Sequence, residues 1–181
     1  GAAYLREVDM SLHRRHFVAP DQGLPVIEGR MVHQHRFPAK AYQGGSGRAA
    51  AWARVAPQDA GPPRAQFGIP RDALSDRAAD RVDLLRVGVC DITAQTNERT
   101  VLAAAVPAGV VCGNKVPTLV FPGARRGATF LALANSLVVD WLARRTITTT
   151  LNWFLLRALP LPPVDPDGPA ALELADRADA L

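Results

Sequence analysis

Apolar runs alternate with short turn signals through the middle of the chain, and this pattern constrains the fold more than any other feature. In the first run Leu85, Val87 and Val89 share one face, and Asp91 follows at the same spacing, which is the period of a half-buried β-strand. A Pro-Ala-Gly turn separates two later runs. The pattern predicts an antiparallel meander with strands in residues 82–93 and 99–106, followed by one or two more strands in 110–121 around Gly113-Asn114.

Helices are expected near the end of the chain. Apolar residues recur at 3- and 4-residue spacing in 128–145, which predicts one long helix, and a last helix is expected from about residue 169. Further elements are expected as a strand at 24–35 with a bulge at Gly29, a Gly-rich loop at 43–47, short strands at 51–56 and 66–69, and a polar helix near 71–79. The fold class predicted is α+β, with a mixed or antiparallel sheet in the first two thirds and helices at the C-terminal end.

A chain of 181 residues is long enough for one domain with a core. We expect a leading segment or linker from a preceding domain at 1–22, the main domain at 23–164 and an acidic helix at 165–181. The chain begins Gly-Ala-Ala rather than with Met, so we expect it to be a piece of a longer protein.

The sequence contains no apolar run of the roughly 18 residues that a membrane span needs, and its charged N-terminal stretch is no signal peptide. Cys90 and Cys112 are too few for a disulfide framework and lie in apolar runs. We therefore expect buried, inert thiols, no membrane partner and a cytoplasmic location.

Basic residues concentrate in two blocks of the sequence. Residues 1–64 hold 9 bases and 5 acids, residues 123–164 hold 5 bases and 1 acid, and the residues from 165 on hold 1 base and 5 acids. Of the 21 basic residues 19 are Arg, which pairs well with phosphate and with guanine edges. The blocks favour a nucleic-acid partner, although a GC-rich genome would also enrich Arg.

Catalytic motifs are missing from the sequence. It has neither a Gly-rich phosphate-binding pattern nor the Asn/Asp-Pro-Pro-aromatic motif that adenine methylation requires. The His pairs at 13/16 and 33/35 bring too few ligands for a metal site. We expect no catalytic residue, no metal and no cofactor in this chain.

One alternative is a small metal-dependent nuclease. Asp21 and Glu28 faintly match the pattern Pro-Asp…Glu-x-Lys, with Arg30 in the place of Lys. Because Arg does not give up its proton, it replaces a catalytic Lys poorly.

The most distinctive sequence lies in residues 86–115, where Asp-Ile-Thr at 91–93 is followed by Thr-Asn-Glu-Arg-Thr at 96–100. This sequence resembles the C-terminal target-recognition domain of N6-adenine DNA methyltransferases, the TaqI-like specificity domain. Three more segments match the family in the same order. They are Pro-Val-Ile-Glu-Gly-Arg-Met-Val-His-Gln-His-Arg-Phe at 25–37, Leu-Ala-Asn-Ser-Leu-Val-Val-Asp-Trp-Leu at 133–142, and 152–162, which begins Asn-Trp-Phe and ends Leu-Pro-Leu-Pro. The match spans about residues 24–163. The sequence departs from the family at Val26-Ile27, where Leu-Tyr is commoner, and in a short Gly-rich stretch after Phe37, where the reading loops should lie.

The resemblance implies a division of labour. A catalytic methyltransferase domain outside this chain would bind S-adenosylmethionine and flip the target adenine, while this domain reads the bases of double-stranded DNA, chiefly from the major groove. The parent would be an adenine-specific methyltransferase or a fused restriction-modification enzyme of a phage-defence type. A specificity or protein-docking subunit that assembles with separate catalytic subunits is the alternative from another class.

Basic and polar donors in the matched segments or just beyond their ends are the candidates for DNA contact. Those expected at base edges or nearby phosphates are Arg30, His33, His35 and Arg36. Those expected at phosphates or in the signature turn are Arg99, Lys115, Arg144, Arg145 and Thr148. Alternatively, Glu28 pairs with Arg30 to fix the strand.

Other residues of the matched segments are expected to be structural. This group comprises Asp91, Thr96, Asn97, Glu98, Thr100 and Asn135. Asn135 is expected to bond to backbone in the core, and Trp141 and Trp153 are expected to be core residues rather than base-stacking ones.

Overall fold

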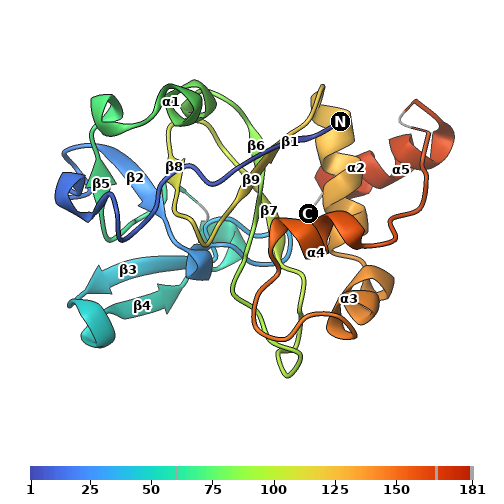
Figure 1. The fold of residues 1–181 in the computed structure, drawn as a ribbon, viewed down its shortest axis with the longest axis horizontal. Coiled ribbons are helices and arrows are strands. Elements are labelled where there is room, and N and C mark those ends of the chain that lie inside the picture. The colour runs from blue at the N-terminus through green and yellow to red at the C-terminus, as the bar shows by residue number, and fades with distance from the viewer. Residues whose placement is uncertain (60, 166, 180–181) are drawn as a thin grey trace.

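A computed structural model describes residues 1–59, 61–165 and 167–179, and it confirms the α+β class with antiparallel pairing and C-terminal helices (Figure 1). The largest sheet has the order β1 (Ala3–Leu5), β9 (Thr118–Val120), β6 (Arg86–Val89) and β7 (Ala103–Val106), all antiparallel. The second sheet has the order β5 (Gly68–Ile69), β2 (Leu24–Ile27) and β8 (Val111–Cys112). The third is a hairpin of β3 (Lys40–Gly44) and β4 (Ala51–Arg54).

The predicted meander is only partly correct. β6 and β7 form the expected hairpin, and the run at 110–121 holds two strands on either side of Gly113, but these two strands enter different sheets rather than continuing the meander. β8 pairs in parallel with β2, where Val111 lies opposite Val26, and β9 returns to the far side of β6. The break falls at Gly113, whose N–H donates to the carbonyl of Ile27, so the chain leaves one sheet and joins the other there.

The expected strand at 24–35 ends early. β2 stops at Ile27, and Gly29–Met31 forms a 3₁₀ turn in which the Met31 N–H donates to the Glu28 carbonyl (2.8 Å). Glu28 and Arg30 therefore lie at the end of the strand rather than along it.

The helices are α1 (Asp76–Val82), α2 (Ala124–Ala134), α3 (Leu137–Arg144), α4 (Trp153–Ala158) and α5 (Pro169–Asp179). The single helix predicted at 128–145 is wrong, because it divides between Asn135 and Ser136. The Ser136 hydroxyl accepts a hydrogen bond from the Val139 N–H and caps α3, while the Asn135 side chain bonds outside the helix. Ser and Asn are residues whose side chains compete with helical backbone bonds.

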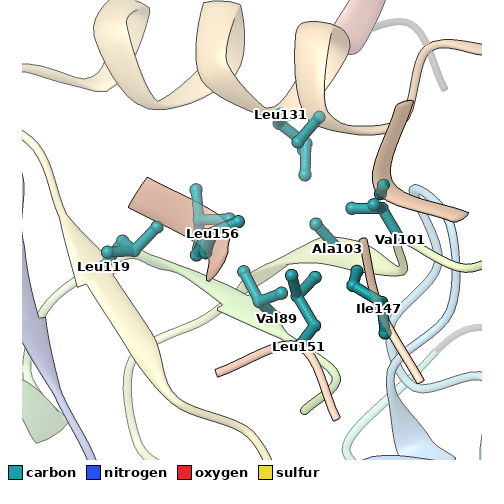
Figure 2. Packing of buried hydrophobic residues seen from close by; sticks show 11 residues of the cluster. Val89, Val101, Ala103, Leu119, Leu131, Ile147, Leu151 and Leu156 are labelled. Carbon is teal, nitrogen blue, oxygen red and sulfur yellow. The ribbon is translucent and has the colours of Figure 1, made fainter. Parts of the chain in front are cut away.

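The main core lies between the β6–β7 face and the C-terminal helices, as Figure 2 shows. Its labelled members, all buried, are Val89, Val101, Ala103, Leu119, Leu131, Ile147, Leu151 and Leu156. α5 packs on α2, and the Thr129 hydroxyl donates to the Ala171 carbonyl (3.3 Å). Trp153 packs against this core and stacks on Tyr4, as expected of a core residue.

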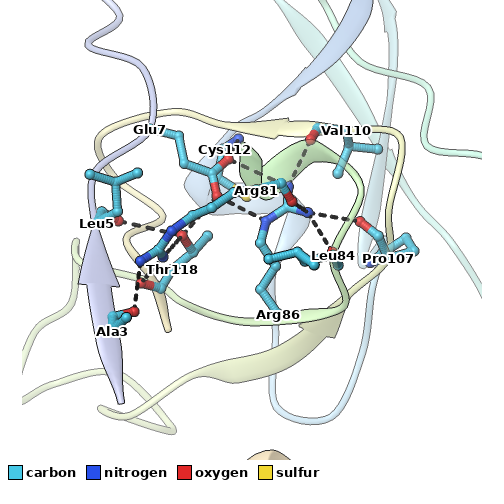
Figure 3. Close-up of polar contacts among 10 residues, drawn as sticks. All are labelled: Ala3, Leu5, Glu7, Arg81, Leu84, Arg86, Pro107, Val110, Cys112 and Thr118. Atoms are coloured by element: carbon cyan, nitrogen blue, oxygen red, sulfur yellow. Dashed lines mark hydrogen bonds and ion pairs between the residues drawn. The ribbon is translucent and has the colours of Figure 1, made fainter. Parts of the chain in front are cut away.

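The leading segment is part of the fold rather than a linker outside it. β1 adds to the main sheet beside β9, and Glu7 is buried. Arg86 donates to Glu7 through Nε (2.8 Å), and both side chains are fully buried. Figure 3 shows how further bonds complete this network. Arg86 also donates to the carbonyls of Arg81, Leu84, Pro107 and Val110, and Glu7 accepts from the Cys112 N–H and the Thr118 hydroxyl. A buried ion pair needs such bonds, because taking both charges out of water is costly.

Cys90 and Cys112 are buried free thiols, as predicted. Trp141 contradicts the prediction of a core residue. It is 57% exposed, and its ring lies under the guanidinium of Arg145, with 5.1 Å between the ring centroid and Cζ. No helix within the described ranges has the length and apolar character to cross a bilayer.

Candidate nucleic-acid interface

Three of the sequence segments singled out above meet at Asn135. Its side-chain Oδ1 accepts from the Ala103 N–H (3.1 Å) and its Nδ2 donates to the Ala103 carbonyl (2.9 Å). Its own carbonyl accepts from Gln34 Nε2 (2.7 Å) and from Arg99. Asn135 is 2% exposed, so it joins β7, the turn after β2 and the signature turn inside the protein, as a structural residue would.

Asp140 makes a second junction between α3 and the signature turn. Its Oδ1 accepts from the backbone N–H groups of Thr100 (2.7 Å) and Val101 (2.8 Å), and its Oδ2 accepts from Arg144 Nε (3.1 Å). Burial by itself would raise the pKa of Asp140, but the two backbone bonds, Arg144 and Arg99 outweigh it and lower the pKa. The carboxylate is therefore charged at neutral pH and replaces backbone partners that the turn lacks.

Two predicted DNA contacts are used inside this junction. Arg99 is 11% exposed, lies 3.6 Å from Asp140 and donates to the Asn135 carbonyl. Arg144 pairs with Asp140 and donates to the carbonyls of Gln95 and Glu98. Both arginines thus bond to carbonyls of the protein and hold the turn, although Arg99 Nε has no hydrogen-bond partner among the described residues.

The other residues of the signature segment, 91–100, include buried ones at the base of the loop and exposed ones at its tip. Asp91 is buried and pairs with Arg6 (3.0 Å). Burial raises the pKa of Asp91, while the nearby Arg6 and Lys115 oppose the rise. Thr93 donates to the carbonyl of Thr100 (2.6 Å) and closes the base of the loop. The tip residues Thr96, Asn97 and Glu98 are exposed.

Cations gather instead around the β3–β4 hairpin and the turn after β2. Lys40 and Arg54 are cross-strand partners, and His33 and Arg36 form an antiparallel bridge close by. Partial burial and the neighbouring charges of Arg36, Arg54 and Lys40 lower the pKa of His33, although Glu98 opposes them. His33 is therefore mainly neutral at pH 7. In Figure 1 the hairpin lies at the opposite end of the long axis from α2 and α5.

Two aromatic rings lie opposite each other in the middle of this hairpin. Arg30 lies over Trp52 with 4.9 Å between Cζ and the ring centroid, and Trp52 packs edge-on against Tyr42. Arg30 also lies 3.6 Å from Glu28, which is the pairing considered from the sequence. Arg36 donates to the carbonyl of Val55 and ties β4 to the turn after β2.

A cleft of about 460 Å³ opens beside the hairpin. Polar side chains that line it are Glu28, Arg30, His33, Lys40 and Lys115. Three residues predicted to contact DNA, Arg30, His33 and Lys115, thus come together here from two separate segments. Lys40 and Arg54 were missed by the sequence analysis. The sequence could have indicated them, because they flank a Gly-rich loop. A hairpin that turns at such a loop places residues from its two strands opposite each other.

The remaining predicted contacts lie elsewhere. His35 has a positive φ of 54° and lines a separate, mainly apolar cavity of about 480 Å³ with Phe37 and Leu131. Burial and the charge of Arg99 lower the pKa of His35. Arg145 and Thr148 are exposed at and beyond the end of α3.

Titratable groups do not form a metal centre within the described ranges, where no three His, Cys, Asp or Glu side chains are grouped so that they could hold an ion. The chain matches no protein-family model, no curated protein and no solved structure. Its function is therefore argued from the site itself.

Proposed function

We propose that this chain is a DNA-recognition domain that holds double-stranded DNA with the β3–β4 hairpin and the cleft beside it. The observation that carries the proposal is the pairing of Lys40 with Arg54 across the hairpin. Like charges directly opposite each other destabilise a strand pair. An anionic partner that lies across both residues reverses this effect, and the phosphates of a duplex are such a partner.

The hairpin also has a suitable shape and charge. The major groove of B-DNA accepts a two-stranded β-ribbon. Residues 30–64, which include the hairpin, contain six basic residues and a single acid, Asp59. Lys40, Arg48 and Arg54 are exposed along it and at its tip, where they can reach phosphates on both sides of a groove.

The finer part of the proposal is sequence-specific recognition for a catalytic domain outside this chain. Its support is the resemblance to the adenine-methyltransferase recognition domain, together with the way the matched segments join at Asn135 and Asp140. In this proposal these two junctions hold the scaffold, and the hairpin reads the DNA. S-adenosylmethionine would belong to the catalytic domain.

The test is fluorescence anisotropy of a labelled duplex over a range of salt concentrations. We expect log K to fall linearly with log salt, by about 0.9 for each phosphate contacted. The double variant Lys40→Ala/Arg54→Ala should bind at least tenfold more weakly, with a shallower slope. The matched control is Arg126→Ala on α2, at the far end of the molecule, which should bind as the wild type does. A flat salt response, or equal losses in both variants, would overturn the proposal.

A protein-docking role is the second candidate, and the surface of α3 favours it. Leu137, Val138 and Trp141 are 76%, 68% and 57% exposed and share one side of the helix, since they are spaced at i, i+1 and i+4. We propose this face as the contact with the catalytic domain or subunit. The neighbouring gene sequence discriminates the two arrangements: an Asn-Pro-Pro-aromatic motif fused upstream indicates one enzyme, whereas a separate methyltransferase gene indicates a specificity subunit.

A further inference from the structure

A basic turn lies near the hairpin and outside the cleft. It comprises residues 13–16, His-Arg-Arg-His, and includes a 3₁₀ turn at Arg14–His16. Both of its arginines are exposed. Eight other arginines in the described part of the chain form ion pairs with Asp or Glu, whereas Arg14 and Arg15 form none with these residues. Their two charges are therefore available to an anion from outside.

Hydrogen bonds hold the basic turn in shape. The Asp9 carboxylate accepts from the N–H of Leu12 (2.9 Å) just before the turn and from the side-chain amide of Asn114 (3.0 Å), which ties the turn to the body of the domain. Within the turn, the His16 N–H donates to the His13 carbonyl (2.9 Å). A surface that is ordered before its ligand arrives loses less entropy on binding, so the turn is organised as a contact surface.

An aromatic ring supports the first of the two arginines. Cζ of Arg14 lies 4.8 Å from the centroid of the Phe67 ring, which stacks in turn on Phe17 with 5.2 Å between centroids. A guanidinium over a ring keeps its planar N–H edge for acceptors at the side, and this edge matches phosphate oxygens. Arg15 donates through Nε to His16 Nε2 (3.0 Å), which leaves its two terminal nitrogens outside that bond.

The segment that follows the hairpin brings the basic turn close to it. The Arg64 carbonyl accepts from the N–H of Tyr42 on β3 (2.8 Å), and Phe67, which supports Arg14, comes three residues later. Three residues span at most about 10 Å. In Figure 1 the blue turn and the hairpin lie at the same end of the long axis. Because DNA carries one charge for about every 1.7 Å of its axis, one duplex can contact both surfaces.

We propose that Arg14 and Arg15 bind the phosphate backbone of the duplex that the hairpin enters, as a second contact outside the cleft. This inference rests on the proposed DNA-binding function and deepens it, since it extends the contact to the flank of the site. Phosphate contacts set the position and orientation of a protein without reading sequence. The basic turn thus orients the hairpin in the groove.

An anionic membrane is the competing partner, because Leu12 beside the turn is 78% exposed. Binding to a membrane surface grows with the apolar area that is buried in it, and one leucine supplies little. The exposed cations continue instead through Arg64 towards Lys40 and Arg54 on the hairpin, which favours a long, polar and regularly charged partner such as DNA.

The experiment measures binding of the full chain to a labelled duplex by fluorescence anisotropy at several salt concentrations. Arg14→Gln/Arg15→Gln should bind at least about fivefold more weakly, with a slope of log K against log salt that is shallower by about 0.9 for each arginine removed. Arg14→Lys/Arg15→Lys should keep the slope. The matched control, Arg126→Gln/Arg157→Gln, removes the same charge from exposed positions on α2 and α4 and should lose less than about twofold in affinity.

Two further measurements separate contact from folding. Circular dichroism checks each variant, and Arg15→Gln alone should still weaken binding if the loss of Arg14 from the Phe67 ring disturbs the fold. Arg15→Cys labelled with an azidophenacyl group should cross-link to the duplex on irradiation, whereas Arg126→Cys labelled in the same way should not. Cys90 and Cys112 are buried, so the label attaches to the introduced thiol.

The outcomes distinguish this inference from the proposed function. Equal losses in the basic-turn and control variants, or no cross-link from position 15, overturn the inference. A loss in Lys40→Ala/Arg54→Ala with none in the basic-turn variant also overturns it and leaves the proposed function intact. The reverse pattern supports the basic turn and overturns the role of the hairpin.

Two results would remove DNA as the partner of the basic turn. Failure of the wild type to bind any duplex overturns the proposed function and this inference with it. Binding to phosphatidylserine vesicles that Arg14→Gln/Arg15→Gln abolishes, while duplex binding stays unchanged, assigns the turn to a membrane surface and overturns the inference alone.

Discussion

Lys40 and Arg54 are Cα partners across the β3–β4 hairpin, so two positive side chains share one face of a two-stranded sheet. Arg36 adds a third positive charge to this region, since its charge, like those of Lys40 and Arg54, lowers the pKa of His33. The free protein therefore keeps a local repulsion at the surface that we assign to DNA.

Removing one of these charges should change protein stability and DNA binding in opposite directions. We expect Lys40→Gln to raise the free energy of unfolding by about 0.2–1 kcal/mol at low salt, because the repulsion across the hairpin disappears. The gain should vanish at high salt, where exposed charges are screened. Urea denaturation at two salt concentrations measures it. A loss of stability at low salt would show that Lys40 is held by interactions other than those described.

Asp140→Ala should destabilise the whole domain by about 3 kcal/mol. The change leaves the buried N–H groups of Thr100 and Val101 without an acceptor and removes the partner of Arg144. Chemical denaturation followed by circular dichroism checks the value. Asp176→Ala, on the exposed side of α5, is the control and should stay within about 0.5 kcal/mol of the wild type.

The stability that Asp140 provides should depend on pH in one direction. Its pKa in the folded protein lies below the ordinary value of 3.8, so the folded state favours the charged form. This contribution is complete above pH 3.8 and is lost as the pH falls through the folded pKa. The difference in unfolding free energy between the wild type and Asp140→Asn should therefore be level near neutrality and shrink below pH 3.8. A difference that grows in acid would contradict the assignment.

The buried pair of Arg86 and Glu7 should show strong coupling. Arg86→Met leaves a buried carboxylate without its cation and should cost about 3–5 kcal/mol. Combining it with Glu7→Gln should cost clearly less than the sum of the two single changes, which a double-mutant cycle measures. The surface pair of Glu173 and Arg177 on α5 is the comparison, with an expected coupling below about 1 kcal/mol.

The two thiols should be nearly inert in the folded protein. Burial raises the pKa of Cys90 to about 11 and raises that of Cys112 further, so the reactive thiolate is scarce at mildly alkaline pH. Titration with a thiol reagent should show slow or no reaction in native buffer and two reactive groups in urea. Rapid reaction of one thiol in native buffer would indicate that the cleft at Cys90 opens.

The sequence predicted the fold class, the β6–β7 hairpin and the last helix, because each depends on local periodicity. It failed where tertiary contacts compete with a local pattern. The apolar spacing of residues 128–145 predicts one helix. In the structure this helix divides, because the Asn135 side chain bonds to Ala103 and Ser136 caps α3. Trp141 has the spacing of a core residue, yet it lies on the face of α3 that its neighbours do not cover.

The candidate site was predictable only in part. Arg30, His33 and Lys115 could be selected as donors in the matched segments, but their meeting at one cleft depends on the turn after Ile27 and on where β8 joins β2. Arg99 and Arg144 were selected by the same criterion and prove to bond within the protein. Residue type alone does not distinguish an arginine that faces a ligand from one that completes a turn, because both need the same planar donor group.

The β3–β4 ribbon forms a sheet of its own, separate from the strand ladders of the other two. Insertions, deletions or charge changes at its tip therefore leave the hydrogen-bond register of those ladders undisturbed. The junctions at Asn135 and Asp140, by contrast, tolerate little change, since each side chain serves several backbone groups at once. Under the proposed function, a molecule divided in this way would acquire a new DNA target by replacing one short ribbon, and libraries randomised between residues 43 and 50 would explore such targets without rebuilding the domain.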